Sequence, residues 1–502
     1  MKILLVYPEY PDTFWSFKHA LKFVRKTAAF PPLGLLTVAS MLPEEWEKRL
    51  IDMNVQPLTD RDLKWADYVF ISAMIVQRQS VNEVIRRAKK LGVKMAAGGP
   101  LFTTEPELFT EVDHLVLNEA EVTLAPFLAD LARGEARHIY STTDHPALTA
   151  TPVPMWSLLD IKKYNSMSLQ YSRGCPFNCE FCDITFLDGR VPRTKERSQV
   201  LAELNAIYDQ GWRGALFIVD DNFIGNKTKL KAEILPAIIR WQDDHKNPFS
   251  LFTEVSINVS DDDDLMKLMT LAGFNRVFVG IETPHEASLV ECNKNQNSSR
   301  DLVAAVKKIQ NNGMEVMGGF IVGFDSDPGS IFKTQISFIQ KSGIVTAMVG
   351  LLNAPRGTRL YQRLQKENRL INQSFTGDNM DASLNFMPKM PPKELIKGYQ
   401  HILETIYAPR YYYERIRVLL QEYQPKAKTR ARLPKSALLG LINSIWFVGI
   451  REKGRRYYWK LFASTLLRKP RVFPMFVTLT VYGYHFRKVV ARTTLLPSGG
   501  TA

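Results

Sequence analysis

Three cysteines lie within eight positions of one another, in the segment RGCPFNCEFC. Cys175, Cys179 and Cys182 have the spacing C-x3-C-x2-C, and Gly174 opens the loop that carries them. Thiolates this close in sequence can converge on one metal centre. Because the only other cysteine in the chain is Cys292, a disulfide framework would be sparse. The triplet therefore indicates a metal site in a reducing compartment rather than a cross-linked, secreted scaffold.

The number of ligands bears on the kind of metal. A structural zinc site normally takes a fourth cysteine or histidine, and none is close by; the nearest histidine upstream is His145. A [4Fe–4S] cluster is usually held by four thiolates, so three of them leave one iron open to a small molecule. The alternative is three structural thiols in a loop. We expect Cys175, Cys179 and Cys182 to hold a metal centre.

Apolar runs that alternate with helical patterns place this loop in an α/β fold. The first part of the chain predicts strands at 2–7, 68–73 and 94–97 and helices at 32–42 and 81–91. This alternation is typical of a parallel, doubly wound (Rossmann-like) sheet, in which ligands bind beyond the carboxyl ends of the strands. The segments expected at those ends are 8–14, 52–54 and the turn Gly98-Gly99-Pro100.

A second alternation carries the cysteine loop directly after its first strand. Strands are predicted at 169–172, 215–219, 251–257, 276–281, 315–322 and 346–352, with helices at 197–210, 230–243 and 299–311. Successive βα units indicate a complete or partial TIM-type barrel, whose chemistry belongs at the C-terminal strand ends. After about residue 388 the pattern becomes helical and aromatic. We therefore expect four parts: a doubly wound domain 1–137, a Thr- and Pro-rich linker 138–160, a barrel 161–387 and a helical basic domain 388–502.

Composition excludes several classes of protein. The chain of 502 residues is 45% hydrophobic and 23% charged, which excludes a disordered or fibrous protein. The apolar run at the N-terminus is broken by Pro8 and is too short for a signal peptide. No stretch of about eighteen apolar residues predicts a membrane span. We expect a cytoplasmic protein, and a peripheral position at the inner membrane face is left open.

The net charge of +14 comes from the C-terminal tail. Residues 425–492 contain sixteen lysines and arginines against one acid, Glu452. Two apolar runs in this stretch, 437–450 and 472–484, are flanked by basic clusters. The pattern suits either a helical subdomain packed on the barrel or an interfacial helix on an anionic membrane. Nucleic acid would attract the same charge, but an apolar and aromatic tail is a poor match for phosphates, so we expect no nucleic-acid partner.

The cysteine segment, with Phe181 before its last cysteine, resembles the signature of the radical S-adenosylmethionine (SAM) superfamily. A doubly wound domain before such a barrel is similar to the cobalamin-binding subclass. The strings FPPLGLLTVASMLP (30–43), AAGGP, LNEAE, DDNFIGN and FVGIETP are similar to a subgroup that includes the bacterial hopanoid C-2 methylases. The tail string NSIWFVGIR (443–451) resembles the C-terminal domain of uncharacterised function in that subgroup. The resemblance covers nearly the whole chain.

This resemblance implies roles for residues of the barrel. Cys175, Cys179 and Cys182 would ligate a [4Fe–4S] cluster whose open iron binds the amino and carboxyl groups of SAM. Reductive cleavage of SAM then yields a 5′-deoxyadenosyl radical. SAM-binding residues are expected at Asp220, Asp221 and Asn222, which would fix the methionine ammonium, at Glu254, which would face the ribose or the SAM carboxylate, and at Glu282, which would touch cofactor or substrate. A capped turn at 220–222 and structural roles for both glutamates are the alternatives.

The cobalamin site has fewer sequence markers. The usual lower-ligand motif D-x-H-x-x-G is absent from the first 150 residues. The resemblance then implies that Gly98 and Gly99 let the backbone approach the corrin ring, while Ser72 and Glu119 meet corrin amides. The alternative for the two glycines is a tight turn without a ligand.

The resemblance implies a cobalamin-dependent radical SAM enzyme that methylates an unactivated carbon of an apolar substrate, isoprenoid or lipid-like, such as a hopanoid. An sp3 carbon offers no nucleophile for ordinary methyl transfer, and a radical route removes that requirement. Its partners would be the small-molecule or lipid substrate and an external electron donor of the flavodoxin or ferredoxin type. The alternatives are a radical SAM cyclase or rearrangement enzyme, and a non-enzymatic cobalamin-binding protein. RNA methylthiolation needs a second cluster, which Cys292 alone cannot supply.

Overall fold

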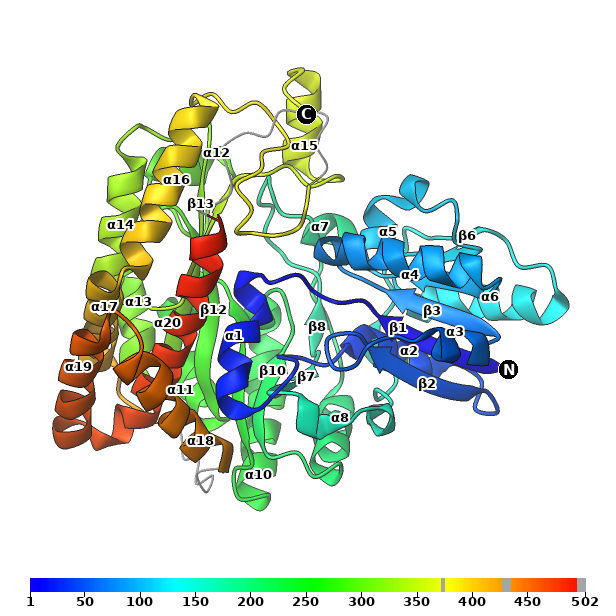
Figure 1. Cartoon of the computed structure of the whole chain (residues 1–502), viewed down its shortest axis with the longest axis horizontal. Coiled ribbons are helices and arrows are strands. Elements are labelled where there is room, and N and C mark those ends of the chain that lie inside the picture. Colours follow the sequence, from blue (N-terminus) through cyan, green and yellow to red (C-terminus); the bar gives the residue numbers. More distant parts are fainter. Residues whose placement is uncertain (372–374, 427–434, 494–502) are drawn as a thin grey trace.

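The computed structural model describes residues 1–371, 375–426 and 435–493. These residues form an N-terminal sheet with helices on both faces, a central open barrel and a C-terminal group of helices (Figure 1). Among the described helices, none is both long enough and apolar enough to cross a bilayer.

The N-terminal sheet has six parallel strands in the order β2-β1-β3-β4-β5-β6. They are β1 (Lys2–Tyr7), β2 (Glu47–Asp52), β3 (Tyr68–Ser72), β4 (Lys94–Gly98), β5 (His114–Val116) and β6 (Ile139–Tyr140). One face is covered by α3 (Asp60–Trp65), α4 (Arg78–Lys90) and α5 (Pro100–Thr104), and the other by α2 (Leu33–Met41) and α6 (Ala120–Arg133). The predicted doubly wound sheet is confirmed, and its strand order reverses between β1 and β3, where such sheets bind ligands.

Three strands of this sheet were not predicted, because they lack the run of apolar residues by which the other strands were identified. The edge strand β2 reads EKRLID, with Glu47 and Arg49 exposed and only Ile51 and Asp52 buried, so it carries no apolar run. The strands β5 and β6 are only three and two residues long. Because β6 lies inside the predicted linker 138–160, that stretch is in part a strand of the sheet rather than a free connection.

The central sheet is a half-barrel of six parallel strands in the order β14-β13-β12-β11-β10-β7, so the partial form of the predicted barrel is confirmed. The strands are β7 (Ser166–Leu169), β10 (Gly214–Ile218), β11 (Phe249–Val255), β12 (Phe274–Glu282), β13 (Glu315–Val322) and β14 (Ala347–Leu351). The main helices between them are α8 (Arg197–Asp209), α10 (Leu235–Asp244), α11 (Asp263–Leu271), α13 (Leu302–Asn311) and α14 (Ile331–Ser342). Shorter elements are α7 (Ile184–Leu187), α9 (Lys227–Lys229), α12 (Glu286–Glu291), α15 (Arg359–Lys366) and the two-stranded hairpin of β8 (Ser172–Arg173) with β9 (Arg193–Thr194).

The first barrel strand differs from its prediction. It occupies Ser166–Leu169 rather than 169–172, and the chain then leaves the barrel to form β8. The reason is that Asp220, at the end of the neighbouring strand, accepts hydrogen bonds from the backbone NH groups of Tyr171 and Ser172, both at 2.8 Å. These bonds turn the chain away from the sheet before the cysteine loop begins.

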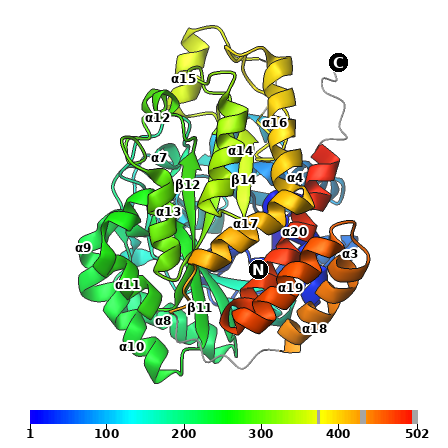
Figure 2. The same cartoon turned by 90° about the vertical axis from the view of Figure 1, so that its left-hand side faces the viewer.

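The C-terminal part is helical, as predicted, and its helices lie along one side of the half-barrel (Figure 2). They are α16 (Pro392–Tyr407), α17 (Pro409–Glu422), α18 (Lys435–Ser444), the π-helical segment η11 (Ile445–Ile450), α19 (Arg455–Arg468) and α20 (Phe473–Thr493). Residues of α16, α17 and α20 share one buried apolar core with the barrel strands. The tail is therefore packed on the barrel and is not an independent unit.

A segment near the N-terminus leaves its own sheet and crosses to the C-terminal helices. We call residues 10–31 the N-terminal strap; it contains η1 (Phe14–Ser16), α1 (Lys18–Leu21) and η2 (Lys22–Val24). In Figure 1, α1 lies beside α20 and away from β1. The ring of Phe14 stacks on that of Phe486, with centroids 4.1 Å apart. Part of the predicted domain 1–137 therefore belongs to the core of the barrel.

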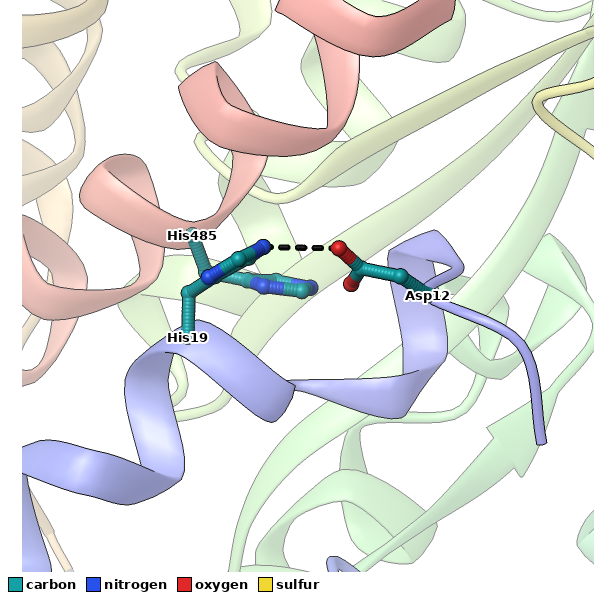
Figure 3. A group of neighbouring side chains, drawn as sticks. All are labelled: Asp12, His19 and His485. Carbon is teal, nitrogen blue, oxygen red and sulfur yellow. Dashed lines mark hydrogen bonds and ion pairs between the residues drawn. The ribbon is translucent and has the colours of Figure 1, made fainter. Parts of the chain in front are cut away.

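A group of polar side chains fastens the strap to α20 (Figure 3). The Asp12 carboxylate bonds to Nε2 of His19 at 2.7 Å and accepts a hydrogen bond from Arg492 at 2.6 Å. His485 is fully buried, and its Nε2 lies 3.0 Å from the carbonyl oxygen of Phe14. Burial lowers the pKa of His485 to about 4. Burial alone would raise the pKa of Asp12, but His19 and Arg492 outweigh it and leave that pKa below its usual range.

These groups predict a loss of stability in mild acid. Since His485 stays neutral when folded but has a pKa of about 6.5 when unfolded, the unfolded state binds more protons as the pH falls. Between about pH 7.5 and about pH 5 the free energy of unfolding should fall by about 2 kcal/mol from this residue alone. His485→Gln should remove that part of the pH dependence in urea unfolding, whereas His401→Gln, at an exposed position of α16, should leave it intact. Equal pH slopes in the wild type and His485→Gln would contradict this prediction.

Candidate functional site

The start of the cysteine loop packs closely against the backbone of residues 188–191. Gly174 has a φ of +90°, and a Cβ at this position would lie 2.7 Å from the carbonyl oxygen of Val191. The backbone NH of Cys175 donates a hydrogen bond to the carbonyl oxygen of Gly189 at 3.2 Å. Only glycine fits both the conformation and the contact, so Gly174 fixes where the first cysteine begins.

The three thiols of the loop are free of disulfides. Cys179 is buried, while Cys175 and Cys182 are partly buried. Burial raises the pKa of Cys175 and of Cys182, and the nearby Cys179 raises both further. Protonated thiols in this environment would ionise when a metal supplies the compensating charge. Three thiols on one loop are soft donors of the kind that iron–sulfur centres use, and the assignment of Cys175, Cys179 and Cys182 as cluster ligands stays a prediction.

The far side of the loop is anchored to the segment after β14. The Glu180 carboxylate accepts two hydrogen bonds from Arg363 of α15, at 2.8 and 3.1 Å. The backbone of Glu180 also bonds to the NH of Leu360 and to the carbonyl oxygen of Cys292, both at 2.9 Å. The loop is thus held from both ends of the half-barrel, which limits how far its thiols can separate.

A buried ion pair that the sequence analysis missed lies behind the thiols. Lys294 pairs with Glu282 at 2.7 Å, and Nε2 of Gln296 lies 3.8 Å from Sγ of Cys179. Glu282 has a φ of +61° at a bulge between β12 and β13, which directs it toward Lys294. The positive charge of Lys294 faces the thiols, since Cys179 and Cys182 both raise its pKa after Glu282 has done so. The only sequence signal was the polar string NKNQN that follows Cys292.

The three polar residues at the end of β10 separate into two roles. The carboxylate of Asp220 is fully buried and accepts bonds from Tyr171, from the NH of Ser172 and from its hydroxyl at 2.6 Å. Asn222 accepts bonds from the NH and hydroxyl of Ser256, at 3.1 and 3.2 Å. Asp220 therefore forms a structural cap. We had expected it to bind a methionine ammonium, but its oxygens already accept these three hydrogen bonds.

Asp221 and Glu254 differ from these neighbours because their carboxylates lack the side-chain contacts that hold Asp220 and Asn222. Within the described residues, neither forms an ion pair or a side-chain hydrogen bond. Burial raises the pKa of Glu254 to about 7, and burial raises that of Asp221 well above its usual value, with Asp188, Glu254 and Asp183 adding to it. Both residues are partly buried, and Lys294 offsets only part of the rise in the pKa of Glu254, so a further cation would stabilise the two carboxylates. They fit a ligand that carries positive charge, such as the sulfonium and ammonium of SAM.

Predicted cobalamin residues lie at the carboxyl edge of the N-terminal sheet. Ser72 ends β3, and Gly98 ends β4. A Cβ at Gly99, where φ is +90°, would lie 2.7 Å from Oγ of Ser72, and a Cβ at Gly98 would lie 2.4 Å from the carbonyl oxygen of Val116. Close packing between neighbouring strands by itself requires both glycines. Whether they also face a corrin ring stays a prediction.

Glu119 has a different place from the one expected. Its carboxylate pairs with Arg173 at 2.7 Å and with Arg193 at 2.8 Å, and with His145 at 3.1 Å. Glu121 binds the same guanidinium of Arg173 at 2.9 Å. Both arginines belong to the β8–β9 hairpin that precedes and follows the cysteine loop. Glu119 therefore joins the N-terminal domain to this loop, and its oxygens are occupied rather than free for corrin amides.

A cavity of about 1040 Å³ lies between the N-terminal sheet, the concave face of the half-barrel and the C-terminal helices. At the sheet edge it is lined by Tyr7, Tyr10, Asn54 and Met74, none of which is a histidine. The barrel contributes mostly aromatic and apolar side chains, together with Glu254 and Arg276: Phe217, Phe252, Phe278 and Met317. At the far end the cavity reaches Leu438, Leu441 and Val477 on α18 and α20. One continuous space thus connects the cofactor edge, the unpartnered Glu254 and the C-terminal surface.

Comparison with protein families divides the chain in the same order. The model for the B12 binding domain matches residues 26–128, that for the Radical SAM superfamily matches 169–332, and a domain of unknown function matches 358–494. A B12 binding domain implies cobalamin, and a radical SAM domain implies a [4Fe–4S] cluster and SAM. The cofactors of this chain are therefore cobalamin, a [4Fe–4S] cluster and SAM.

Individual relatives agree over nearly the full length. An uncharacterized methyltransferase of Synechocystis sp. is 41% identical over 97% of this chain and 91% of its own. The hopanoid C-2 methylase of Rhodopseudomonas palustris is 34% identical over 93% of this chain and 90% of its own. Among solved structures, the radical SAM methyltransferase TsrM of Kitasatospora setae, with cobalamin and a [4Fe–4S] cluster bound, has the same fold, with a TM-score of 0.62 at 13% identity and coverage of 98% and 99% of the two chains. The chain therefore belongs to the cobalamin-binding radical SAM methyltransferase family, in the subgroup that includes the bacterial hopanoid C-2 methylases.

Proposed function

We propose that this enzyme methylates an unactivated carbon of an apolar, isoprenoid or lipid-like substrate such as a hopanoid. The observation that carries the proposal is the cavity, whose barrel wall consists largely of aromatic and aliphatic side chains. Burial of apolar surface would hold such a substrate without any specific polar anchor. The 34% identical relative named hopanoid C-2 methylase supports the same substrate class.

We further propose that Cys175, Cys179 and Cys182 hold the cluster and that Asp221 and Glu254 bind the cationic groups of SAM. When bound, the cluster and SAM supply hydrogen abstraction from an unreactive carbon, and cobalamin supplies the methyl group. Glu254 fits this role because it lines the cavity and, within the described residues, its carboxylate forms no ion pair or side-chain hydrogen bond. The parallel rings of Phe217 and Phe252, with centroids 4.8 Å apart, keep water out of the space beside it.

At the carboxyl edge of the N-terminal sheet, Ser72, Gly98 and Gly99 remain our candidates for contact with cobalamin, although they do not line the cavity. We add Tyr7, Tyr10 and Asn54, which line it at the same sheet edge. The side chain of Asn54 donates to the carbonyl oxygen of Pro8 at 3.2 Å, so the loop after β1 is fixed where it borders the cavity. Electrons would come from an external donor of the flavodoxin or ferredoxin type. Free thiols and this chemistry both suit the reducing cytoplasm.

The cluster assignment is tested by replacing one thiol. In anaerobically reconstituted protein, Cys179→Ala should lose the iron–sulfur absorption and form no deoxyadenosine from SAM, because two thiolates cannot hold the cluster. The matched control is Cys292→Ala, a buried cysteine outside the loop, which should keep its iron and sulfide. Circular dichroism checks that both variants fold. Normal deoxyadenosine formation by Cys179→Ala would refute the assignment.

The role of Glu254 predicts a loss of cofactor affinity. Glu254→Gln removes a negative charge that would face a cation in the cavity, so binding of SAM to reconstituted protein should weaken at least about ten-fold. Calorimetry without a reductant measures this step apart from turnover. Asp209→Asn, at an exposed carboxylate at the end of α8, serves as the control and should bind SAM as the wild type does. Unchanged affinity in Glu254→Gln would remove this residue from the SAM site.

Product mass separates methylation from ring formation or rearrangement. Lipid extracts from cells with and without the gene should differ by a species that is heavier by one methyl group and carries label from methyl-labelled methionine. A product that has only lost hydrogen would instead support cyclisation. If the protein binds cobalamin but forms neither deoxyadenosine nor a modified product under any condition, the result would support a binding role alone.

A further inference from the structure

An exposed apolar stripe runs along the outer face of α18 and η11. Leu438, Ile442, Trp446 and Ile450 recur every four residues, and their exposed fractions are 61%, 54%, 47% and 46%. Residues four apart share one face of a helix. The opposite face of the same segment is buried, with Ser444 and Val448 fully covered. The stripe is therefore a continuous surface feature and not a set of scattered side chains.

The stripe continues onto the next helix. The indole NH of Trp459, on α19, donates a hydrogen bond to the carbonyl oxygen of Gly449 at 2.8 Å, which places it next to Ile450. Trp459 is 41% exposed, and α19 carries two further exposed leucines, Leu466 and Leu467. Two adjoining helices thus present tryptophan and aliphatic side chains to the solvent.

Basic residues border this apolar surface, and no free acid lies among them. Arg451 and Lys453 are exposed in the connection from η11 to α19, and Arg455 and Arg456 are exposed in the first turn of α19. The guanidinium of Arg451 lies 4.8 Å from the ring centre of Trp446. The one acid of residues 435–493 is Glu452, and Arg487 neutralises it with bonds of 3.1 and 2.5 Å. A surface that combines apolar and cationic groups in this way matches the interface of an anionic bilayer.

The same helix also borders the cavity. Ala437, Gly440 and Leu441 of α18 line it, opposite Val477 and Val481 of α20. Leu438 belongs to both surfaces, since it lines the cavity and is also the first member of the exposed stripe. The cavity therefore meets the molecular surface beside the stripe, at the N-terminal end of α18.

We infer that α18, η11 and α19 dock on an anionic lipid bilayer, with the stripe in the acyl boundary, and that an apolar substrate enters the cavity from the bilayer between α18 and α20. The entry route rests on the proposed function, whereas docking does not. The arrangement removes the need for an apolar substrate to cross water, because the cavity mouth lies at the level of the inserted side chains.

Docking is tested by flotation of the full-length holoenzyme with vesicles of equal parts phosphatidylglycerol and phosphatidylcholine. The wild type should float with these vesicles and bind pure phosphatidylcholine much less. Ile442→Ser/Trp446→Ser should reduce the bound fraction on the order of ten-fold, because two apolar side chains that would insert at the acyl boundary are replaced by polar ones. Salt at about 1 M should release the wild type, because it screens charges beyond about 3 Å.

The matched control is Leu108→Ser/Ile139→Ser, which removes two exposed apolar side chains from the N-terminal domain, with exposed fractions of 53% and 43%. This control should bind vesicles as the wild type does. Wild-type binding by Ile442→Ser/Trp446→Ser, no binding by the wild type, or binding of RNA in preference to vesicles would each overturn the inference.

A conservative variant keeps the test decisive if the double variant does not fold. Brominated lipids should quench the tryptophan emission of the wild type, and Trp446→Phe should bind normally but lose part of that quenching. Full quenching in Trp446→Phe would show that this residue does not enter the bilayer. Deoxyadenosine formation without vesicles should be equal in all these variants, because neither Ile442 nor Trp446 lines the cavity. Its absence in every variant would refute the proposed function and leave docking standing.

Discussion

The arrangement of the whole site depends on a buried group of charges between the first domain and the cysteine loop. Glu119 and Glu121, at the start of α6, hold Arg173, which stands immediately before Gly174, and Glu119 also holds Arg193. All four side chains are largely shielded from water, with side-chain exposures of 14% or less. Charges buried in this way stay stable only while every partner is present. This contact therefore sets the position of the cysteine loop relative to the N-terminal sheet, in addition to the chain that connects them.

A half-barrel leaves one side of its sheet uncovered, and this protein closes it with parts from both ends of the chain. The N-terminal strap and α20 meet across the opening through Phe14, Phe486 and the Asp12 group. Helix α18 covers the lower part and reaches the strap through the side chain of Asn443, which donates to the carbonyl oxygen of Phe23 at 2.8 Å. The enclosed space keeps its apolar lining because these closing elements bring aromatic side chains with them.

Sequence reasoning succeeded where the signal is local and failed where a role depends on a distant partner. The cysteine triplet and the alternation of strands and helices lie within short windows, so spacing and periodicity reveal them. Asp220 and Glu119 were expected to contact ligands, but their oxygens bond to residues 26 to 74 positions away. Lys294 and the strap were missed because nothing in their own neighbourhood shows which surface they meet. The exposed stripe could have been found, since its four-residue period is visible in the tail, but burial on the opposite face could not.

The contact between strap and α20 also orders the events of synthesis. Phe14 leaves the ribosome long before Phe486, so the two rings cannot stack until α20 has also emerged. Domains generally fold as they emerge, N-terminal part first. The N-terminal sheet and the half-barrel can thus form around an interior that is still open, and bulky cofactors have access to it during that interval. Loss of α20 would leave the strap without its partner and the cavity open on one side.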